Sequence, residues 1–262
     1  MTTLFIDGAP ATLEDLAHQA LANYGAYTSF RVEGGGVRGL DRHLARLARQ
    51  STALFGQSPS EARFRERMRQ ALAGGREAWL RVSLFSRRIT HRDAGWVGEP
   101  SIMVAIGDPP PPLQGPLRLM VRTYVREEPE LKHTATFGLM RGRRAAQSAG
   151  FDDALFVDAD GVISEGSLWN IGFLRGETVV WPQAPMLAGV AQALVQAGLP
   201  GVGLGFETRP VSRGDLAGFD AAFICNSATP ACAVASIDDH PFAPPPLEAL
   251  RAAWASQPCQ PI

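Results

Sequence analysis

A run of four consecutive prolines, in "GDPPPPLQGP" (residues 107–116), constrains the fold of this 262-residue chain more than any other feature. Proline fixes φ and has no backbone N–H, so such a run enters neither the interior of a helix nor an inner strand. It favours a stiff, extended connection. We therefore predict a small N-terminal domain over 1–106 and a larger domain over 117–262, with 107–116 as the linker.

The hydrophobic pattern on either side of this linker mixes helices with strands. In the stretch 40–55, Leu40, Leu44 and Leu47 recur at spacings of three and four, which predicts a helix with one buried face. Thr12, followed by an acid three residues later, is the expected cap of an earlier helix. Further helices are expected at about 138–149, from about 188, and at 246–256; strands are expected at 3–8, 27–33, 78–86, 101–107, 117–125, 153–158, 162–166, 168–176, 203–208, 219–226 and 232–238. This order predicts an α+β fold rather than a doubly wound parallel sheet.

Charge and cysteine usage exclude several classes of function. The formal net charge is −1, so the chain has no field that would attract nucleic acid or an anionic membrane. No window reaches the roughly 18 apolar residues of a membrane span. The three cysteines lack metal-ligand or disulfide spacing, so we expect no metal site and a reduced, cytoplasmic protein.

Lys132, in "EPELKHTATFG" (128–138), is the only lysine in the chain, although lysine and arginine together number 25. Arginine replaces lysine as a surface charge, but it does not deprotonate in a protein. A primary amine that must attack a carbonyl and form a Schiff base therefore has no arginine substitute. Retention by chance in an arginine-rich composition is the alternative explanation.

Three other segments complement such an amine. Glu165, in "VISEGSLWNIGF", stands among small and apolar residues just after a strand, where it could pair with a cationic nitrogen. "PMLAGVAQAL" (185–194) begins a helix whose first N–H groups could bind a phosphate. "ICNSATP" (224–230) places polar side chains, including Thr229, after an apolar strand. An amine, an acid and an anion cradle are what pyridoxal phosphate requires.

The order of these segments is recognisable. Lys132 followed by "GFDDALFVDADGVISEGSLWNIGF", "LAGVAQAL" and "ICNSATP" resembles the class IV, fold-type IV pyridoxal-phosphate aminotransferases. This family includes branched-chain aminotransferases, D-amino-acid aminotransferases and aminodeoxychorismate lyases. Upstream, "GAYTSFRVEGGGVRGLDRHLARL" (25–47) is similar to the family's N-terminal pattern, so the resemblance covers nearly the whole chain.

The resemblance implies a two-domain fold, a small α/β domain and a larger one with pyridoxal 5'-phosphate between them, completed by a homodimer partner. It implies that Lys132 forms the Schiff base and shuttles a proton, and that Glu165 pairs with the pyridinium nitrogen. The remaining implied contacts to the cofactor come from Arg46, the backbone N–H groups of Val190 and Ala191, Asn226 and Ser227. The implied contacts to the substrate come from Tyr27, Thr28 and Arg31.

Two departures from the family pattern stand out. The phosphate helix, usually G-I-T-R, here reads Gly189-Val190-Ala191-Gln192 and so lacks a hydroxyl and an arginine. Because backbone N–H groups survive these changes, we expect weaker phosphate binding rather than none. Phe137 stands where some members have a tyrosine near the cofactor.

We expect a transaminase that transfers an amino group from an amino acid or amine to a 2-oxo acid. The triplets "LKH" and "ICN" are closer to the aminodeoxychorismate lyases, so a lyase that releases pyruvate and forms 4-aminobenzoate is the alternative. A non-catalytic homologue that binds a phosphorylated ligand is the alternative from another class. The retained lysine argues against it, because simple binding would tolerate arginine.

Overall fold

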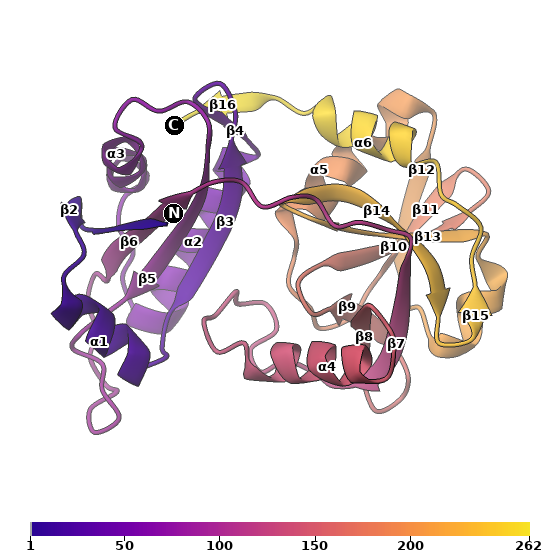
Figure 1. Ribbon diagram of the computed structural model, residues 1–262, viewed down its shortest axis with the longest axis horizontal. Coiled ribbons are helices and arrows are strands. Elements are labelled where there is room, and N and C mark those ends of the chain that lie inside the picture. The colour runs from indigo at the N-terminus through magenta and orange to yellow at the C-terminus, as the bar shows by residue number, and fades with distance from the viewer. Residues whose placement is uncertain (1) are drawn as a thin grey trace. The chain divides into compact units, whose positions relative to one another are not determined.

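The computed structural model describes residues 2–262, which divide into two compact units (Figure 1). Unit 1 contains the residues up to Pro111 together with Leu131–Ala135 and Pro258–Ile262, and unit 2 contains Pro112–Glu130 and Thr136–Gln257. The division expected from the sequence, 1–106 and 117–262, therefore differs from these units at two short segments. These segments, Leu131–Ala135 and Pro258–Ile262, pair with strands that lie far away in the sequence. The local hydrophobic pattern does not indicate such pairings.

Unit 1 is a five-stranded antiparallel sheet covered on one face by helices. The strand order is β2-β1-β6-β5-β3, formed by β1 (Thr3–Ile6), β2 (Ala9–Pro10), β3 (Ala26–Val32), β5 (Ala78–Phe85) and β6 (Ser101–Gly107). The helices are α1 (Leu13–Leu21), α2 (Leu40–Phe55) and α3 (Glu61–Leu72). A two-stranded sheet pairs β4 (Gly36–Arg38) with β16 (Cys259–Pro261), which brings the end of the chain into this unit.

The core of unit 1 follows from the expected helical stripe. Leu40, Leu44 and Leu47 on α2 are buried and pack with Phe30 and Val32 on β3. The predicted cap of α1 is confirmed: the Thr12 hydroxyl accepts from the Asp15 N–H, and the Asp15 carboxylate accepts from the Thr12 N–H. Each of these features is local in the sequence, which is why it could be predicted.

Unit 2 is built on a nine-stranded mixed sheet. The strand order is β12-β11-β10-β13-β14-β7-β8-β9, with β15 paired to β14. The strands are β7 (Leu117–Thr123), β8 (Asp153–Val157), β9 (Ile163–Gly166), β10 (Asn170–Arg175), β11 (Thr178–Pro182), β12 (Gly205–Arg209), β13 (Ala221–Asn226), β14 (Thr229–Ile237) and β15 (His240–Pro241). Parallel pairs (β11 with β12, β14 with β7, β7 with β8) occur together with antiparallel pairs in this sheet, so the expected α+β class is confirmed.

Three helices complete unit 2: α4 (Phe137–Ser148), α5 (Val190–Gly198) and α6 (Leu247–Ala255). The helices α5 and α6 share an apolar cluster with the sheet that includes Trp181, Phe223 and Leu250, and α4 packs on β8 through Leu139 and Phe156. Among residues 2–262, no helix has the length and apolar content needed to cross a bilayer.

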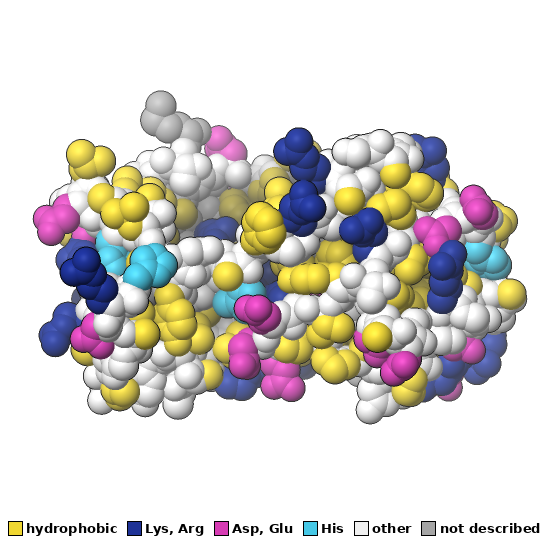
Figure 2. Space-filling view, turned by 90° about the horizontal axis from the view of Figure 1, so that it is seen from below, with side chains coloured by type: hydrophobic (Ala, Val, Ile, Leu, Met, Phe, Trp, Pro, Cys, Tyr) yellow, Lys and Arg dark blue, Asp and Glu magenta, His cyan; other side chains and the backbone are white. Residues whose placement is uncertain are grey.

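The surface carries charges of both signs. On the face shown in Figure 2, acidic and basic side chains are interspersed with apolar ones, in keeping with the net charge of −1. This mixture offers no continuous basic patch for a polyanion on that face.

Candidate functional site

Lys132 belongs to a short segment that adds to the free edge of β3. The N–H of Tyr27 donates to the carbonyl oxygen of Lys132 at 2.9 Å, and the N–H of Thr134 donates to the carbonyl oxygen of Gly25 at 2.9 Å. A bridge between Ala26 and His133 completes the pairing. The Lys132 Nζ lies 4.9 Å from the centroid of the Tyr27 ring, within the range of a cation–π contact. Backbone pairing therefore fixes the position of the lysine within unit 1.

Arg46 is buried on α2, where its guanidinium is bound to a neighbouring hydroxyl. Its Nη2 donates to Thr28 Oγ1 at 2.5 Å, and the same Oγ1 lies 2.6 Å from His43 Nδ1. The exposed fractions of Thr28, His43 and Arg46 are 0%, 2% and 5%. These three side chains form a dry polar cluster, which we call the Arg46 triad. His43 stands three residues before Arg46 in the H-x-x-R-L pattern (43–47) that is part of the family resemblance, but the sequence alone indicated no role for it.

The charge state of His43 follows from its surroundings. Burial lowers the pKa of His43 well below its usual 6.5, and the positive charges of Arg46 and Lys132 lower it further. The imidazole is therefore neutral at physiological pH. The dependence on Lys132 also places the lysine's charge within electrostatic range of the Arg46 triad.

The three residues expected to face a substrate do not share one face of β3. Successive side chains on a strand point to opposite faces. Thr28 is turned towards α2, where its hydroxyl is hydrogen-bonded to Arg46 and His43. Tyr27 and Arg31 lie on the other face, and Arg31 there pairs with Glu33 at 3.2 Å. The immediate partners of Thr28 are thus protein groups.

Arg81 joins Tyr27 on this second face. The guanidinium carbon of Arg81 lies 3.6 Å from the centroid of the Tyr27 ring. Arg81 comes from β5, where it pairs with Ser29 of β3. Tyr27 therefore has two cationic side chains, Arg81 and Lys132, against its ring. This concentration of positive charge suits an anionic substrate, and the alternation of "AWLRVSLF" alone gave no reason to select Arg81.

Glu165 lies on β9 of unit 2 and is only 8% exposed. Its Oε1 lies 3.3 Å from Nη2 of Arg126, whose guanidinium also donates to the carbonyl oxygen of Pro129. A permanently charged guanidinium at this distance stabilises the negative charge of a buried carboxylate. An ionised Glu165 can accept a hydrogen bond from a cationic ring N–H. Sequence reasoning missed Arg126, because the run "VREEPE" is typical of a solvated surface segment.

The turn after Glu165 is anchored by a second buried acid, Asp153. Its Oδ2 accepts from the Ser167 hydroxyl at 2.8 Å and from the Trp169 indole N–H at 2.9 Å. Gly166 lies against the Trp169 ring so closely that a Cβ at this position would overlap it. The segment between Glu165 and β10 is therefore held in one conformation by Asp153 of β8 and by the Trp169 ring.

The N-terminus of α5 is packed against the end of β10. The amide Nδ2 of Asn170 donates to the carbonyl oxygen of Leu187 at 3.0 Å, and a Cβ on Gly189 would collide with the Asn170 Oδ1. Among the described residues, no side chain caps this helix, whose first residues Val190 and Ala191 are buried. Glycine thus allows the backbone to approach here, and the first N–H groups of α5 fit a phosphate. The helix was expected from about 188 and begins at Val190.

Asn226 and Ser227 form the turn between β13 and β14. The Asn226 Oδ1 accepts from the N–H groups of Ala228 and Thr229 at 3.0 and 2.8 Å, and its Nδ2 donates to the carbonyl oxygen of Leu168 at 3.3 Å. The amide therefore shapes the turn and ties it to the segment after Glu165. Ser227 follows in the same turn and is half-buried.

Two further residues were singled out in the sequence. The Thr229 hydroxyl accepts from the Leu113 N–H at 2.9 Å, so it helps to hold the linker. Phe137, at the start of α4, is 78% exposed.

The structure thus gathers the expected residues in two groups. Unit 1 brings together Lys132, Tyr27 and the Arg46 triad. Unit 2 brings together the Glu165 turn, the start of α5 and the Asn226–Ser227 turn. Asn170, at the end of the Glu165 turn, binds the Leu187 carbonyl before α5, and Asn226 binds the Leu168 carbonyl within the Glu165 turn. A primary amine, a buried guanidinium, a buried carboxylate and a helix N-terminus without a side-chain cap are the kinds of group that pyridoxal phosphate requires.

Burial raises the pKa of the Cys225 thiol to about 12, so it stays protonated at neutral pH. Within residues 2–262, no three His, Cys, Asp or Glu side chains are grouped so as to hold a metal ion.

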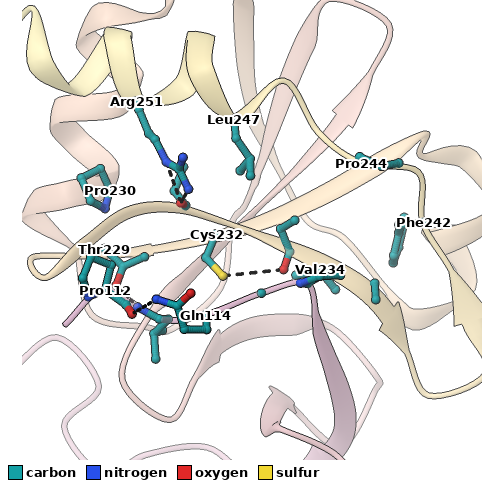
Figure 3. A pocket seen from close by; sticks show the side chains of 16 residues that line it. Pro112, Gln114, Thr229, Pro230, Cys232, Val234, Phe242, Pro244, Leu247 and Arg251 are labelled. Carbon is teal, nitrogen blue, oxygen red and sulfur yellow. Dashed lines mark hydrogen bonds between the residues drawn. The ribbon is translucent and has the colours of Figure 1, made fainter.

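A cavity of about 720 Å³ in unit 2 lies between the linker, β14 and α6 (Figure 3). Its polar lining groups are turned to the protein: Arg251 donates to the carbonyl oxygen of Ala231, and the Thr229 hydroxyl binds Leu113. None of the residues assigned above to the amine, the acid or the phosphate cradle lines this cavity.

The sequence and the structure were compared with those of known proteins. The family model described as "Amino-transferase class IV" matches residues 25–237. No curated protein sequence matches the chain.

Several solved structures share the fold. A branched-chain amino acid aminotransferase from Escherichia coli is 18% identical, with a TM-score of 0.81 over 97% of this chain and 92% of that one. A PLP-bound hypothetical aminotransferase from Mycobacterium tuberculosis is 20% identical, with a TM-score of 0.77 over 98% and 99%. A putative 4-amino-4-deoxychorismate lyase from Legionella pneumophila is 19% identical, with a TM-score of 0.75 over 89% and 91%. At this identity the similarity establishes the fold of the chain, a two-domain fold-type IV architecture.

Proposed function

Because the chain belongs to the class IV aminotransferase family, we propose that it is a pyridoxal-phosphate-dependent transaminase. It would move an amino group from an amino acid or amine to a 2-oxo acid. The observation that carries the proposal is the placement of the one lysine of the chain beside Tyr27 and the Arg46 triad. A lysine kept only as a surface charge would be replaceable by arginine.

Each proposed cofactor contact uses a group with matching chemistry. Lys132 Nζ is the nucleophile that attaches the cofactor, and Glu165 accepts from its ring N–H. The phosphate is bound by the Arg46 guanidinium, by the N–H groups of Val190 and Ala191, and by the Ser227 hydroxyl. Asn226 contributes by holding the turn that carries Ser227, as its hydrogen bonds indicate. When bound, pyridoxal phosphate supplies an electron sink for the carbanion formed on loss of the substrate Cα proton.

Residues of the protein carry out the proton transfer and bind the substrate. Lys132 Nζ, in its uncharged form, takes the proton from the substrate Cα and returns it. We propose that Tyr27, Arg31 and Arg81, on one face of β3 and β5, face the substrate, with Arg81 binding its carboxylate. We assign Thr28 to positioning rather than to the substrate, since its hydroxyl already binds Arg46 and His43. A homodimer is also proposed, on the basis of family membership, and light scattering would test it.

A lyase is the second candidate. It is favoured by the triplets "LKH" at Lys132 and "ICN" at 224–226, and by the similarity to the putative lyase structure. The same lysine and acid would serve it, but the reaction would release pyruvate by β-elimination and leave 4-aminobenzoate.

A screen of amino donors of both hands separates the two candidates. A transaminase converts the bound cofactor to its amine form when a donor is added, which shifts the absorbance, and a 2-oxo acid restores the original band. The lyase is indicated if no donor produces this shift while 4-amino-4-deoxychorismate yields pyruvate and 4-aminobenzoate. A purified protein that takes up no pyridoxal phosphate would contradict both and leave a non-catalytic homologue.

A further inference from the structure

We propose that His43 is a positioning residue for the phosphate-binding arginine: its Nδ1 accepts from the Thr28 hydroxyl, and that hydroxyl holds the Arg46 guanidinium in place. The inference rests on the proposed function in one respect, the assignment of Arg46 to the cofactor phosphate. It gives a role to a residue that the assigned contacts to cofactor and substrate do not include.

The direction of the hydrogen bonds in the Arg46 triad follows from the chemistry of its three groups. A guanidinium only donates, so Thr28 Oγ1 is the acceptor in its 2.5 Å contact with Arg46 Nη2. The hydroxyl has one proton of its own, and its other close polar neighbour is His43 Nδ1, at 2.6 Å. That proton therefore points to Nδ1, which must be unprotonated, and the imidazole carries its proton on Nε2.

Because the Arg46 triad is buried, Arg46 depends on the chain of hydrogen bonds through Thr28 to His43. Thr28 is fully buried and His43 is 2% exposed, so bulk water cannot take the place of a missing partner. The His43 ring is also fixed by Phe30, with 4.8 Å between ring centroids. Without an acceptor at His43, the Thr28 hydroxyl is free to turn its proton towards Arg46, and Arg46 Nη2 also loses its own 3.4 Å contact with His43 Nδ1. A long arginine side chain has many rotamers, and one correct hydrogen bond selects among them.

The electrostatics are consistent with a neutral acceptor. Burial lowers the pKa of His43, and the cations that face it, Arg46 on its own helix and Lys132 on the segment beside β3, lower it further. A protonated Nδ1 could not accept from Thr28, so the same surroundings that suppress protonation preserve the hydrogen-bond chain.

Two pairs of variants test the chain with matched controls. His43→Leu removes the acceptor, whereas His43→Asn retains an oxygen near the position of Nδ1. Thr28→Val removes the hydroxyl at nearly constant shape, whereas Thr28→Ser retains it. For each apo protein the Kd of pyridoxal phosphate is compared with that of pyridoxal, which lacks the phosphate, and thermal melts check the fold.

His43→Leu and Thr28→Val should each raise the Kd of pyridoxal phosphate about 10-fold. The Kd of pyridoxal should change less than about two-fold, and His43→Asn and Thr28→Ser should recover most of the affinity. Unchanged phosphate-ester affinity in the two deletion variants would overturn the proposal. Equal losses for both ligands would also overturn it, because a merely structural role does not discriminate between them.

Inorganic phosphate separates this proposal from the proposed function. Its binding, followed by calorimetry, needs Arg46 but no cofactor chemistry. Suppose that the parent protein takes up no pyridoxal phosphate but binds inorganic phosphate, and that His43→Leu and Thr28→Val bind inorganic phosphate less tightly than the parent. The proposed function would then fail and the positioning role would stand. Phosphate affinity that is absent, or equal in all variants, would contradict the positioning role.

Discussion

Backbone hydrogen bonds at Lys132 and Thr134 pair this segment with β3: the Tyr27 N–H donates to the Lys132 carbonyl oxygen, and the Thr134 N–H donates to the Gly25 carbonyl oxygen. The Lys132 side chain lies against the Tyr27 ring. A lysine placed by its backbone keeps its position whether its amine is charged or neutral, and a nucleophilic amine must pass through both states.

Substitution of this residue separates charge from nucleophilicity. Lys132→Arg keeps the positive charge and the backbone pairing, but a guanidinium neither attaches the cofactor nor acts as a base at neutral pH. We expect turnover to fall by at least about 10³-fold, while the free energy of unfolding changes by no more than about 0.5 kcal/mol. Steady-state rates and urea denaturation measure the two effects. Activity near that of the parent would disprove the catalytic assignment of Lys132.

His43 makes the stability of unit 1 depend on pH. Its folded-state pKa is lowered below 6.5, so between 6.5 and that lower value the unfolded chain binds a proton that the folded chain does not. Stability from this group is therefore complete above pH 6.5 and declines as the pH falls, by up to about 1.4 kcal/mol per pH unit. Urea denaturation of the apo protein between pH 7.5 and 5.5 should show this loss for the parent and a smaller one for His43→Asn. Equal slopes would contradict the neutral, buried imidazole.

Residues differ in how far the sequence can reveal them. Lys132 could be selected because no other lysine competes with it, and Glu165 because an acid is unusual among apolar neighbours. Arg81, Arg126 and Asp153 could not, because each is a common residue in an ordinary-looking segment. Their importance arises from burial beside partners that tertiary folding supplies, such as Arg126 at 3.3 Å from Glu165.

Among the elements, α5 is the one whose position most directly concerns the proposed phosphate site. Gly189 has φ −71 and ψ 133, a backbone conformation open to any residue, so its role is steric. It leaves room for the Asn170 Oδ1, while the amide nitrogen of Asn170 holds the Leu187 carbonyl.

Gly189→Ala should therefore displace the start of α5. We expect the Kd of pyridoxal phosphate to rise about 10-fold or more and the unfolding free energy to fall by about 1–3 kcal/mol, as for other overpacked sites. Gly201→Ala is the matched control, since no atom of the described residues lies within 4 Å of a Cβ at that position. Spectroscopic titration and thermal melts of both variants give the comparison. If the two variants bound the cofactor alike, the tight packing at Gly189 would have no role in holding the phosphate.

The elements predicted correctly are those with local signals. The cap of α1 and the stripe of α2 are of this kind, and so is the α5 helix, which begins within two residues of its expected start. The strand β11 was not expected, although its burial in the sheet is nearly complete. The pairing of β4 with β16 was also missed, because it joins residues more than 200 positions apart and includes a proline. A short strand forms only when it pairs with a partner strand, and the local sequence pattern does not indicate which segment that partner is.

At the scale of the whole molecule, the chain enters unit 1 three times. The proline run does lie where unit 1 gives way to unit 2, at Pro111 and Pro112. The segment Leu131–Ala135, however, returns to unit 1 before the chain continues in unit 2. Lys132 lies in this returning segment, so the residue proposed to attach the cofactor belongs to a different unit from Glu165. The linear order of the sequence could not indicate this assignment, because it depends on the pairing with β3.

The central claim, that Lys132 attaches pyridoxal phosphate, can be tested by borohydride reduction of the cofactor-loaded protein and peptide mass spectrometry. The chain has a single lysine, so a reduced adduct on a side-chain amine has one possible location. We predict one adduct per chain, in the peptide containing Lys132, together with loss of the absorbance band of the bound cofactor. We predict no adduct in Lys132→Arg. An adduct that is absent, or that is confined to the N-terminal amine, would contradict the account.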